Sequence, residues 1–279
     1  MQEYKLPENG VYFLTAMTSL PSHNGVKINQ RLLTAPAGAV LTLAWLKAQG
    51  ISGKLANYYV TSGWLYRLGD GAYTLRSDAP DWLGAVFGLQ QKAGSFHPGG
   101  RTALELVSLA HFLPLGERAP LYLFCRTGVR LPEWFKNLPW AERVRQVGTN
   151  FLPADLGLRD HPVGGHAVRI SDPERAVLEF LFHLDVDEAG YEHARLLFEG
   201  LGTLRPALLQ TLLEKCTSVK VKRLFLHLAE LQQHPWLQEL DQSRISLGRG
   251  KRVLVAGGRL DPKFLITVPT AVTVPVDAP

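Results

Sequence analysis

Cysteine is scarce in this chain, because its 279 residues contain only Cys125 and Cys216. Two cysteines are too few for a disulfide framework or for a zinc site built on thiolates. Cys125 falls in an apolar, strand-like run, and Cys216 ends a helical pattern. We therefore expect both to be buried thiols of a protein in a reducing compartment.

Long hydrophobic runs are also missing. No apolar run approaches the roughly 18 residues that a membrane-spanning helix needs. The first ten residues, MQEYKLPENG, are too polar for a signal peptide. We expect a cytoplasmic protein without membrane association, and its 46% apolar residues are enough to bury a core in one large or two ordinary domains.

The sequence lacks the motifs of common catalytic centres. It has no G-x-S-x-G, no H-E-x-x-H, no Walker A motif and no nuclease-like Asp…Glu-x-Lys carboxylates. His161 and His166 lie five apart in HPVGGH, and His183 is near Asp187, but two ligands do not make a metal site. Residues 99–102 precede a helical pattern and could cradle an anion, yet they lack the P-loop lysine. We predict a non-enzymatic protein without metal or cofactor.

Charge is mildly positive, with a net charge of +5 and a pI of about 9.2. The excess of lysine and arginine lies in the first two thirds of the chain, and the last third is close to neutral. This distribution is compatible with phosphate as a partner of the N-terminal part.

The stretch from Val26 to Leu75 has the pattern of a winged helix-turn-helix. The helical segments expected there are 27–34, about 42–50, and 53–61. Thr42 and Ser52 can cap the second and third helices through their hydroxyls. Gly50 can end the second helix in a left-handed conformation, with apolar Ile51 after it. A helix, a glycine-containing turn and a second helix present a recognition helix to the DNA major groove.

One side of the third helical segment is polar. Ile51, Leu55 and Tyr59 are expected to face the core, and the other side carries Lys54, Asn57, Tyr58 and Thr61. Lysine neutralises phosphate, asparagine can bond an adenine edge in a bidentate way, and tyrosine and threonine can bond phosphate or thymine. We expect this side to contact DNA.

A β-hairpin is expected directly after the third helix. Its strands are 64–68 and 72–75, and Gly69-Asp70-Gly71 forms the turn between them. Arg67 and Arg76 flank the hairpin, which would act as the wing. The predicted DNA-binding residues are therefore Lys54, Asn57, Tyr58, Thr61, Arg67 and Arg76. The alternative is a winged-helix fold used for protein contact, with no nucleic acid.

The chain divides into three predicted parts. Residues 1–24 form an arm, 25–80 the winged helix-turn-helix domain, and 81–279 a larger C-terminal domain, with Asp78-Ala-Pro80 as a hinge. The predicted fold class is α+β, an N-terminal winged helix-turn-helix followed by a larger mixed α/β domain with a helical bundle.

The C-terminal part alternates helical and strand patterns. The expected helices are 81–94, 102–111, 132–136, 171–184, 188–200, 205–216 and 219–232, and the last ones should form the bundle. The expected strands are 121–125, 142–147, 244–247, 252–255 and 264–268. Thr102–Glu105 and Ser171–Glu174 have the spacing of capping boxes. Residues after Pro269 are expected to be frayed.

Two basic runs lie near the C-terminus. The residues predicted to bind a partner there are Lys220, Lys222, Arg223, Lys251 and Arg252. Such a surface would suit an acidic partner or more DNA. The alternative is a solvated helix face and a loop.

Several stretches together resemble the AbiEi-type antitoxins of type IV toxin–antitoxin systems. They are Ala39–Trp64, LGDGAY of the wing, WLGAVFGLQ, GGRTALEL, HFLPLG, LPEWFKN, SDPERAVLEFL, LRPALLQTLLEKC, SVKVKRLFLHLAE, HPW, GRGKRVLVAGGRLD and ITVP. Each motif alone is short, but their order and spacing are specific and extend from about Lys27 to Pro269. The long arm before Lys27 departs from the pattern.

The resemblance implies a protein with two activities. One is repression of its own operon through promoter DNA, and the other is antagonism of a cognate nucleotidyltransferase toxin, by contact or indirectly. A monomer that pairs on inverted repeats in the promoter is expected. The alternatives are a transcriptional regulator whose C-terminal domain senses a small ligand, and an enzyme with a DNA-binding module; the missing catalytic motifs weigh against the enzyme.

Overall fold

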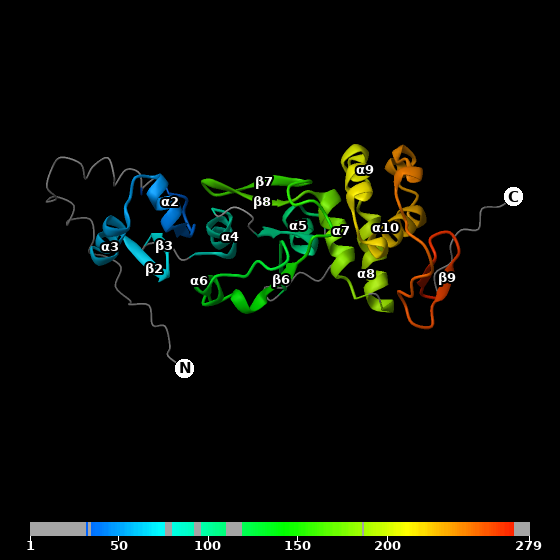
Figure 1. The fold of residues 1–279 in the computed structure, drawn as a ribbon, viewed down its shortest axis with the longest axis horizontal. Coiled ribbons are helices and arrows are strands. Elements are labelled where there is room, and N and C mark those ends of the chain that lie inside the picture. Colours follow the sequence, from blue (N-terminus) through cyan, green and yellow to red (C-terminus); the bar gives the residue numbers. More distant parts are fainter. Residues whose placement is uncertain are drawn as a thin grey trace.

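The computed structural model describes residues 32, 35–75, 80–91, 96–109, 119–185 and 187–270. The elements of residues 41–75 lie toward one end of the long axis, α4–α6 and β6–β8 in the middle, and α7–α10 and β9 toward the other end (Figure 1). The arm, the first helical segment apart from Leu32, Arg76, the hinge apart from Pro80, and the tail after residue 270 lie outside the described residues.

The N-terminal unit is a winged helix-turn-helix, as predicted. Its elements are β1 (Leu41–Thr42), α2 (Leu43–Ala48), α3 (Gly53–Thr61), β2 (Leu65–Gly69) and β3 (Ala72–Leu75). The Thr42 hydroxyl accepts from the Trp45 N–H at 3.2 Å, and the Ser52 hydroxyl accepts from the Leu55 N–H at 3.3 Å. Both predicted caps are therefore confirmed. Gly50 has a φ of 82°, so the left-handed end of α2 is confirmed as well.

The wing is an antiparallel hairpin with an additional short strand beside it. β3 pairs with β2 on one side and with β1 on the other, and a register shift lies between Arg67 and Gly69. Gly71 has a φ of 70° in the turn, which favours glycine. The sequence did not predict β1. This strand fixes the base of the wing to the start of α2.

α4 (Trp82–Gln90) packs directly on the winged helix-turn-helix unit. The Val40 N–H donates to the Gly84 carbonyl at 3.0 Å, and the Gln91 side chain bonds both Thr42 and the Val40 carbonyl. Val40 and Ala72 share a buried cluster with residues from beyond the hinge. The boundary at residue 80 remains a prediction, because the two sides of it share this core.

The central region contains a small mixed sheet. β4 (His97–Pro98) is antiparallel to β5 (Leu121–Cys125), and β5 is parallel to β6 (Val144–Gly148). α5 (Gly100–Leu106) follows β4. α6 (Glu133–Lys136) and a 3-10 turn at Ala141–Arg143 lie in the connection from β5 to β6. The strand at 121–125 and the helical turn before Asn137 were predicted.

A two-stranded hairpin was missed by the sequence analysis. β7 (Leu158–Val163) pairs antiparallel with β8 (His166–Ser171), and the two glycines of the HPVGGH segment, Gly164 and Gly165, form its turn. Gly164 takes a φ of 54° there. The histidines of this segment therefore lie on a hairpin and not on a free loop.

The helical bundle was predicted and is present. Its helices are α7 (Pro173–His183), α8 (Glu188–Glu199), α9 (Pro206–Lys215) and α10 (Val219–Leu231). They enclose the largest buried apolar cluster among the described residues, in which Leu178, Phe198 and Phe225 are fully buried. None of the helices among the described residues has the length and apolar character needed to cross a membrane.

Both predicted capping boxes are wrong. α5 begins two residues before Thr102, whose hydroxyl instead accepts from the Tyr122 N–H at 2.8 Å. α7 begins at Pro173, and the Ser171 hydroxyl donates to Glu179 at 2.7 Å. In each case a tertiary partner binds the hydroxyl that the local pattern assigned to a helix end.

The C-terminal segment contains fewer strand residues than predicted. β9 (Arg259–Asp261) and β10 (Ile266–Val268) form an antiparallel pair, after 3-10 turns at Pro235–Glu239 and Gln242–Arg244. The predicted strand at 244–247 is absent, and 252–255 contributes one isolated bridge, from Arg252 to Ile266. The sequence missed β9.

Candidate nucleic-acid interface

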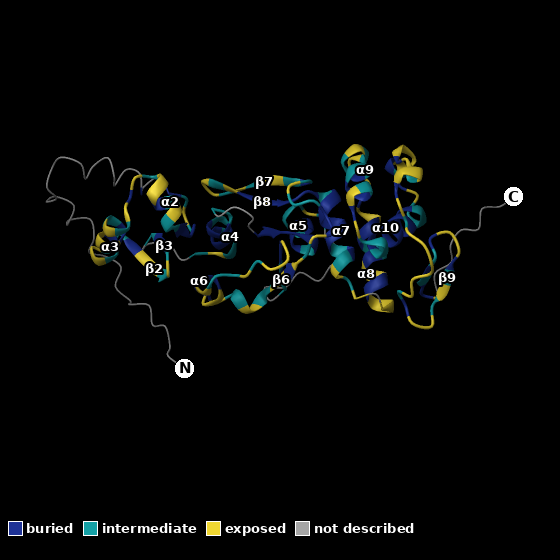
Figure 2. Cartoon of the chain, viewed as in Figure 1, coloured by how far each residue is buried: buried dark blue, intermediate teal, exposed yellow. Residues whose placement is uncertain are grey.

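The outer side of α3 carries the four polar residues that the sequence assigned to DNA. Lys54, Asn57, Tyr58 and Thr61 are exposed, and Tyr58 retains 56% of its accessible surface (Figure 2). Ile51, Ala56 and Tyr59 on the other side are buried. The helical periodicity therefore placed these side chains correctly on the solvent face, and their contact with DNA remains a prediction.

The wing and α3 are joined by Arg67. Its guanidinium donates a hydrogen bond to the Asn57 side-chain carbonyl and lies 5.4 Å from the centre of the Tyr73 ring. The carbonyl oxygen of an asparagine has two lone pairs, so Asn57 can still accept a second hydrogen bond and donate two. Arg67 thus holds the Asn57 amide in one orientation while its own charge stays exposed.

Tyr66 was not singled out from the sequence. It is 44% exposed on β2, next to Arg67 in the sequence, so the wing carries a second large exposed aromatic side chain besides Tyr58 of α3. An exposed aromatic residue next to an arginine in a predicted wing was the signal that could have identified it. Arg76, the remaining predicted DNA contact, lies outside the described residues.

The predicted partner surface is wrong for two of its five residues. Lys222 and Arg223 are 4% and 1% exposed, on the buried side of α10. The Arg223 guanidinium donates to the carbonyls of Leu247 at 2.8 Å, Gly250 at 2.6 Å, Leu265 at 3.2 Å and Gly248 at 3.3 Å. Gly248 and Gly250 both have a positive φ, and Arg223 binds the carbonyls of Leu247, Gly248 and Gly250 at this turn. The Leu265 carbonyl also accepts from the Arg252 N–H at 2.9 Å.

The other three residues of that surface differ among themselves. Lys220 is half-buried and donates to the Leu184 carbonyl at 2.8 Å. Lys251 and Arg252 are exposed, and between them and β9 lies Val253 at 73% exposure. The accessible part of the predicted surface is therefore the loop 251–253, which combines two cations with an apolar side chain.

The helix N-termini of α5 and α8 are occupied by carboxylates of the protein itself. The Gly100 N–H donates to the Glu179 carboxylate at 3.1 Å, so a protein carboxylate occupies the anion position that residues 99–102 suggested. Asp187 caps α8 through the Gly190 N–H at 2.7 Å, as expected of a helix start. Among the described residues, no three side chains of the metal-binding types lie close enough to hold an ion.

A buried ionic cluster connects the central sheet to the bundle. The Glu179 carboxylate accepts from His97 at 2.9 Å, Arg175 at 2.7 Å and Ser171 at 2.7 Å. Burial alone would raise the pKa of Glu179, but the charges of His97 and Arg175 and the hydrogen bonds hold this pKa at about 2. No local pattern in the sequence predicts this cluster, because its members lie up to 82 positions apart.

A second polar chain is closed to solvent. The Tyr191 hydroxyl lies 2.8 Å from His227 Nε2, and His227 Nδ1 lies 2.6 Å from the Asp261 carboxylate. Burial raises the pKa of Tyr191, and the Asp261 charge raises it further. The three residues have the order of a proton relay, but all are buried. Their evident effect is to fix β9 against α8 and α10.

Comparison with known proteins gives a consistent result. A family model described as "Transcriptional regulator, AbiEi antitoxin N-terminal domain" matches residues 24–115, and one described as "Transcriptional regulator, AbiEi antitoxin, Type IV TA system" matches residues 118–269. Among solved structures, the chain is similar to the RV2827C protein from Mycobacterium tuberculosis, with a TM-score of 0.52 and 15% identity, over 86% of this chain and 88% of that chain. At this identity the likeness concerns the fold alone. No curated protein matches the chain.

The two family models match in chain order and cover nearly the whole sequence, and the first of them includes the winged helix-turn-helix described above. The resemblance inferred from the sequence motifs is thereby confirmed. The chain belongs to the AbiEi antitoxin family of transcriptional regulators from type IV toxin–antitoxin systems.

Proposed function

We propose that this protein represses its own operon by binding promoter DNA and counteracts a cognate nucleotidyltransferase toxin, without itself catalysing a reaction. The observation that carries the first half is the exposed polar side of α3, tied to the wing by the bond from Arg67 to Asn57. A recognition helix with an adjacent wing is a common means of reading the major groove.

The residues of this interface have different roles in the proposal. Asn57 reads a base, because its amide can donate and accept at one adenine edge. Lys54 and Arg67 neutralise phosphates, and Tyr58 and Thr61 bond phosphate or thymine. Arg67 also orients Asn57, so its loss would affect base reading and phosphate binding together. The protein is proposed to be monomeric in solution and to pair on inverted repeats.

The experiment compares the full-length Asn57→Ala and Lys54→Ala variants on the promoter fragment and on random DNA. Asn57→Ala should lose about 1–3 kcal/mol on the promoter and little on random DNA. Lys54→Ala should weaken binding to both by a similar factor. Arg67 is not a clean control, because it contacts Asn57. Normal promoter affinity of Asn57→Ala would show that another side of the unit reads DNA.

The second half of the proposal concerns the C-terminal domain. Family membership supports toxin antagonism, and the exposed loop with Lys251, Arg252 and Val253 lies before β9, at the opposite end of the molecule from α3 (Figure 1). Exposed cations favour encounter with an acidic partner, and an exposed apolar side chain adds buried area on contact. Lys220 would lie at the margin of this contact.

A growth-rescue assay tests this half. The double variant Lys251→Glu with Arg252→Glu should fail to rescue toxin-arrested cells while it retains promoter affinity and melting temperature. The double variant Lys54→Ala with Asn57→Ala is the matched control. It should rescue growth but no longer bind the promoter fragment. Rescue by the first variant at the wild-type level would mean that the loop does not take part in antagonism.

A further inference from the structure

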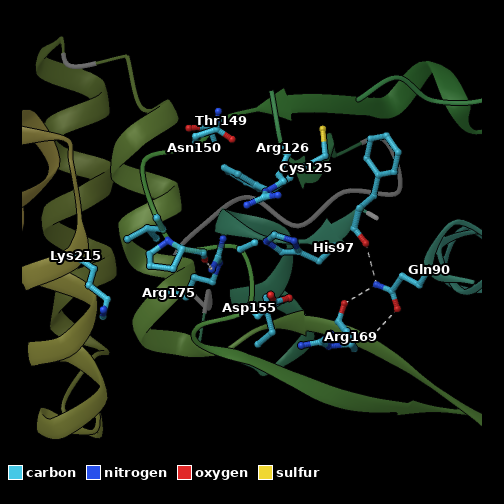
Figure 3. Close-up of a pocket in the computed structure, with 16 residues that line it drawn as sticks. Gln90, His97, Cys125, Arg126, Thr149, Asn150, Asp155, Arg169, Arg175 and Lys215 are labelled. Atoms are coloured by element: carbon cyan, nitrogen blue, oxygen red, sulfur yellow. Dashed lines mark hydrogen bonds between the residues drawn. The ribbon is translucent and has the colours of Figure 1, made fainter. Parts of the chain in front are cut away.

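A cavity of about 690 Å³ lies in the central region of the molecule, between the small sheet, the β7–β8 hairpin and the bundle (Figure 3). Its polar lining includes His97, Arg126, Asn150, Arg169, Arg175 and Lys215. This volume is within the usual range of small-ligand sites.

The cavity lies where two parallel strands end. Arg126 directly follows the last residue of β5, and Thr149 and Asn150 directly follow the last residue of β6. Open sheets with parallel strands bind ligands outside the carboxyl ends of those strands, because loops from neighbouring strands meet there. The position of the cavity is therefore one that favours a ligand site.

The cavity carries an excess of positive charge. Arg126 follows β5, Arg169 lies in β8 and Lys215 ends α9. All three are exposed and form no ion pair or side-chain hydrogen bond with any residue that the structure describes. Asp155 is the one carboxylate side chain in the lining. The Arg175 charge is already balanced by Glu179. Unpaired cations gathered at a concave surface focus a positive potential and attract anions.

The walls of the cavity are held in place before any ligand binds. The Gln90 side chain accepts from the Arg169 N–H at 2.8 Å and donates to the Arg169 carbonyl at 2.7 Å (Figure 3). Arg175 donates to the carbonyls of Pro153 at 2.6 Å and Leu156 at 2.7 Å. In Figure 3, Arg126 and Arg169 lie on opposite sides of His97. Such preorganisation reduces the entropy cost of binding.

The lining is not only charged. Phe96, Phe124 and Leu152 contribute apolar surface, while the Asn150 amide and the Thr149 hydroxyl offer hydrogen-bonding groups. A ligand that matches all of these has a flat apolar part with polar edges and a phosphate group. We propose that this cavity is a binding site for a nucleoside di- or triphosphate, with the phosphates on Arg126, Arg169 and Lys215. The proposal is independent of DNA binding and of toxin antagonism.

The test is calorimetric titration of the full-length protein at 200 mM salt with adenosine and guanosine triphosphates, with adenosine, and with inorganic tripolyphosphate. A nucleoside triphosphate should bind in a saturable manner, and more tightly than adenosine or tripolyphosphate. Arg126→Gln and Arg169→Gln should each weaken binding about 10-fold or more, since each removes a charge-assisted contact. The three cations are exposed, so the variants should melt as the wild type does.

Two matched controls locate the binding. Arg130→Gln removes an exposed arginine four positions from Arg126 that does not line the cavity, and Lys54→Gln removes a cation from α3. Both should leave nucleotide affinity within about twofold of wild type. The absence of saturable triphosphate binding at millimolar concentration, or an equal loss in Arg130→Gln, overturns the proposal. If tripolyphosphate binds as tightly as a nucleoside triphosphate, the cavity does not recognise the nucleoside. If a 5′-phosphorylated oligonucleotide binds more tightly than the free nucleotide, and this binding depends on Arg126, the ligand is not a free nucleotide.

Discussion

Glu179 shows how one buried residue links the central sheet to the bundle. Its carboxylate has no exposed surface and binds His97, Arg175, Ser171 and the Gly100 N–H. A buried charge is tolerated only when it is paired and hydrogen-bonded, and here both oxygens are. The Glu179 carboxylate also accepts from the first N–H of α5, so this helix N-terminus is already occupied by an anion of the protein.

Replacing Glu179 with glutamine should destabilise the protein in a pH-dependent way. Its pKa of about 2 is below the usual 4.5, so the ionised form stabilises the folded state by about 3 kcal/mol at neutral pH. This contribution is complete above about pH 4.5 and is lost as the pH falls through 2. Denaturant unfolding of Glu179→Gln and wild type should therefore differ most at pH 7 and converge towards pH 2.

Glu133→Gln is the matched control for this experiment. Glu133 forms an exposed ion pair with Lys136 on α6, so its loss should change stability by less than about 1 kcal/mol at every pH. A difference between Glu179→Gln and wild type that does not change with pH would mean that the effect comes from packing and not from the charge.

Arg223 should behave as a structural residue and not as a surface one. Arg223→Ala leaves the carbonyls of Leu247, Gly248 and Gly250 without their donor, so we expect a loss of about 3 kcal/mol in the free energy of unfolding. Arg249→Ala, at an exposed position of the same loop, should change little. Thermal melting of both variants measures the contrast, and equal melting temperatures would refute it.

At the scale of elements, the features of the fold that could be predicted are those set by local sequence signals. The caps at Thr42 and Ser52, the glycine end of α2 and the apolar spacing of α3 act within a few residues, so the sequence alone specifies them. The β7–β8 hairpin has a local turn signal in Gly164-Gly165, but Pro162 argues against a strand just before it. β7 pairs with β8 alone, so Pro162 lies on an edge strand, where the missing N–H costs little.

In the candidate DNA-binding site, too, features set by local sequence could be predicted and features set by tertiary contacts could not. The exposed side of α3 could be predicted, because helical periodicity decides which residues face solvent. The bond from Arg67 to Asn57 could not, because it joins side chains of two different elements, ten positions apart in the sequence. The burial of Lys222 and Arg223 depends on a distant loop, and a charged pair on an amphipathic helix is normally exposed.

The contact between α4 and the winged helix-turn-helix unit depends on a glycine. A Cβ added at Gly84 would lie 1.9 Å from the Gly38 carbonyl oxygen, which is backbone and cannot rotate away. Gly84→Ala should therefore separate α4 from Val40 and lower stability by about 1–3 kcal/mol. Gly202→Ala, where a Cβ meets nothing within 4 Å, is the control in the same melting experiment. Equal melting temperatures would mean that this contact adds nothing to stability.

At the scale of the whole molecule, the elements form a continuous chain of shared cores. α4 joins the winged helix-turn-helix to the central sheet, and the Glu179 cluster joins that sheet to the bundle. A ligand in the central cavity would therefore contact residues of the sheet, the hairpin and the bundle at once. This arrangement places the proposed DNA-binding surface and the proposed partner surface at opposite ends of one connected body (Figure 1).

Salt dependence distinguishes phosphate contact by one end from diffuse attraction by a basic protein. If α3 and the wing engage about five phosphates, the logarithm of affinity should fall with the logarithm of salt concentration at a slope of about −4.5, roughly 500-fold between 50 and 200 mM. Lys54→Ala should reduce this slope by about one unit, because it removes one phosphate contact. Lys251→Ala, an exposed lysine at the far end, should leave it unchanged. Full-length binding to the promoter fragment across salt measures all three, and an equal change in slope for both variants would mean that DNA contacts the whole length of the molecule.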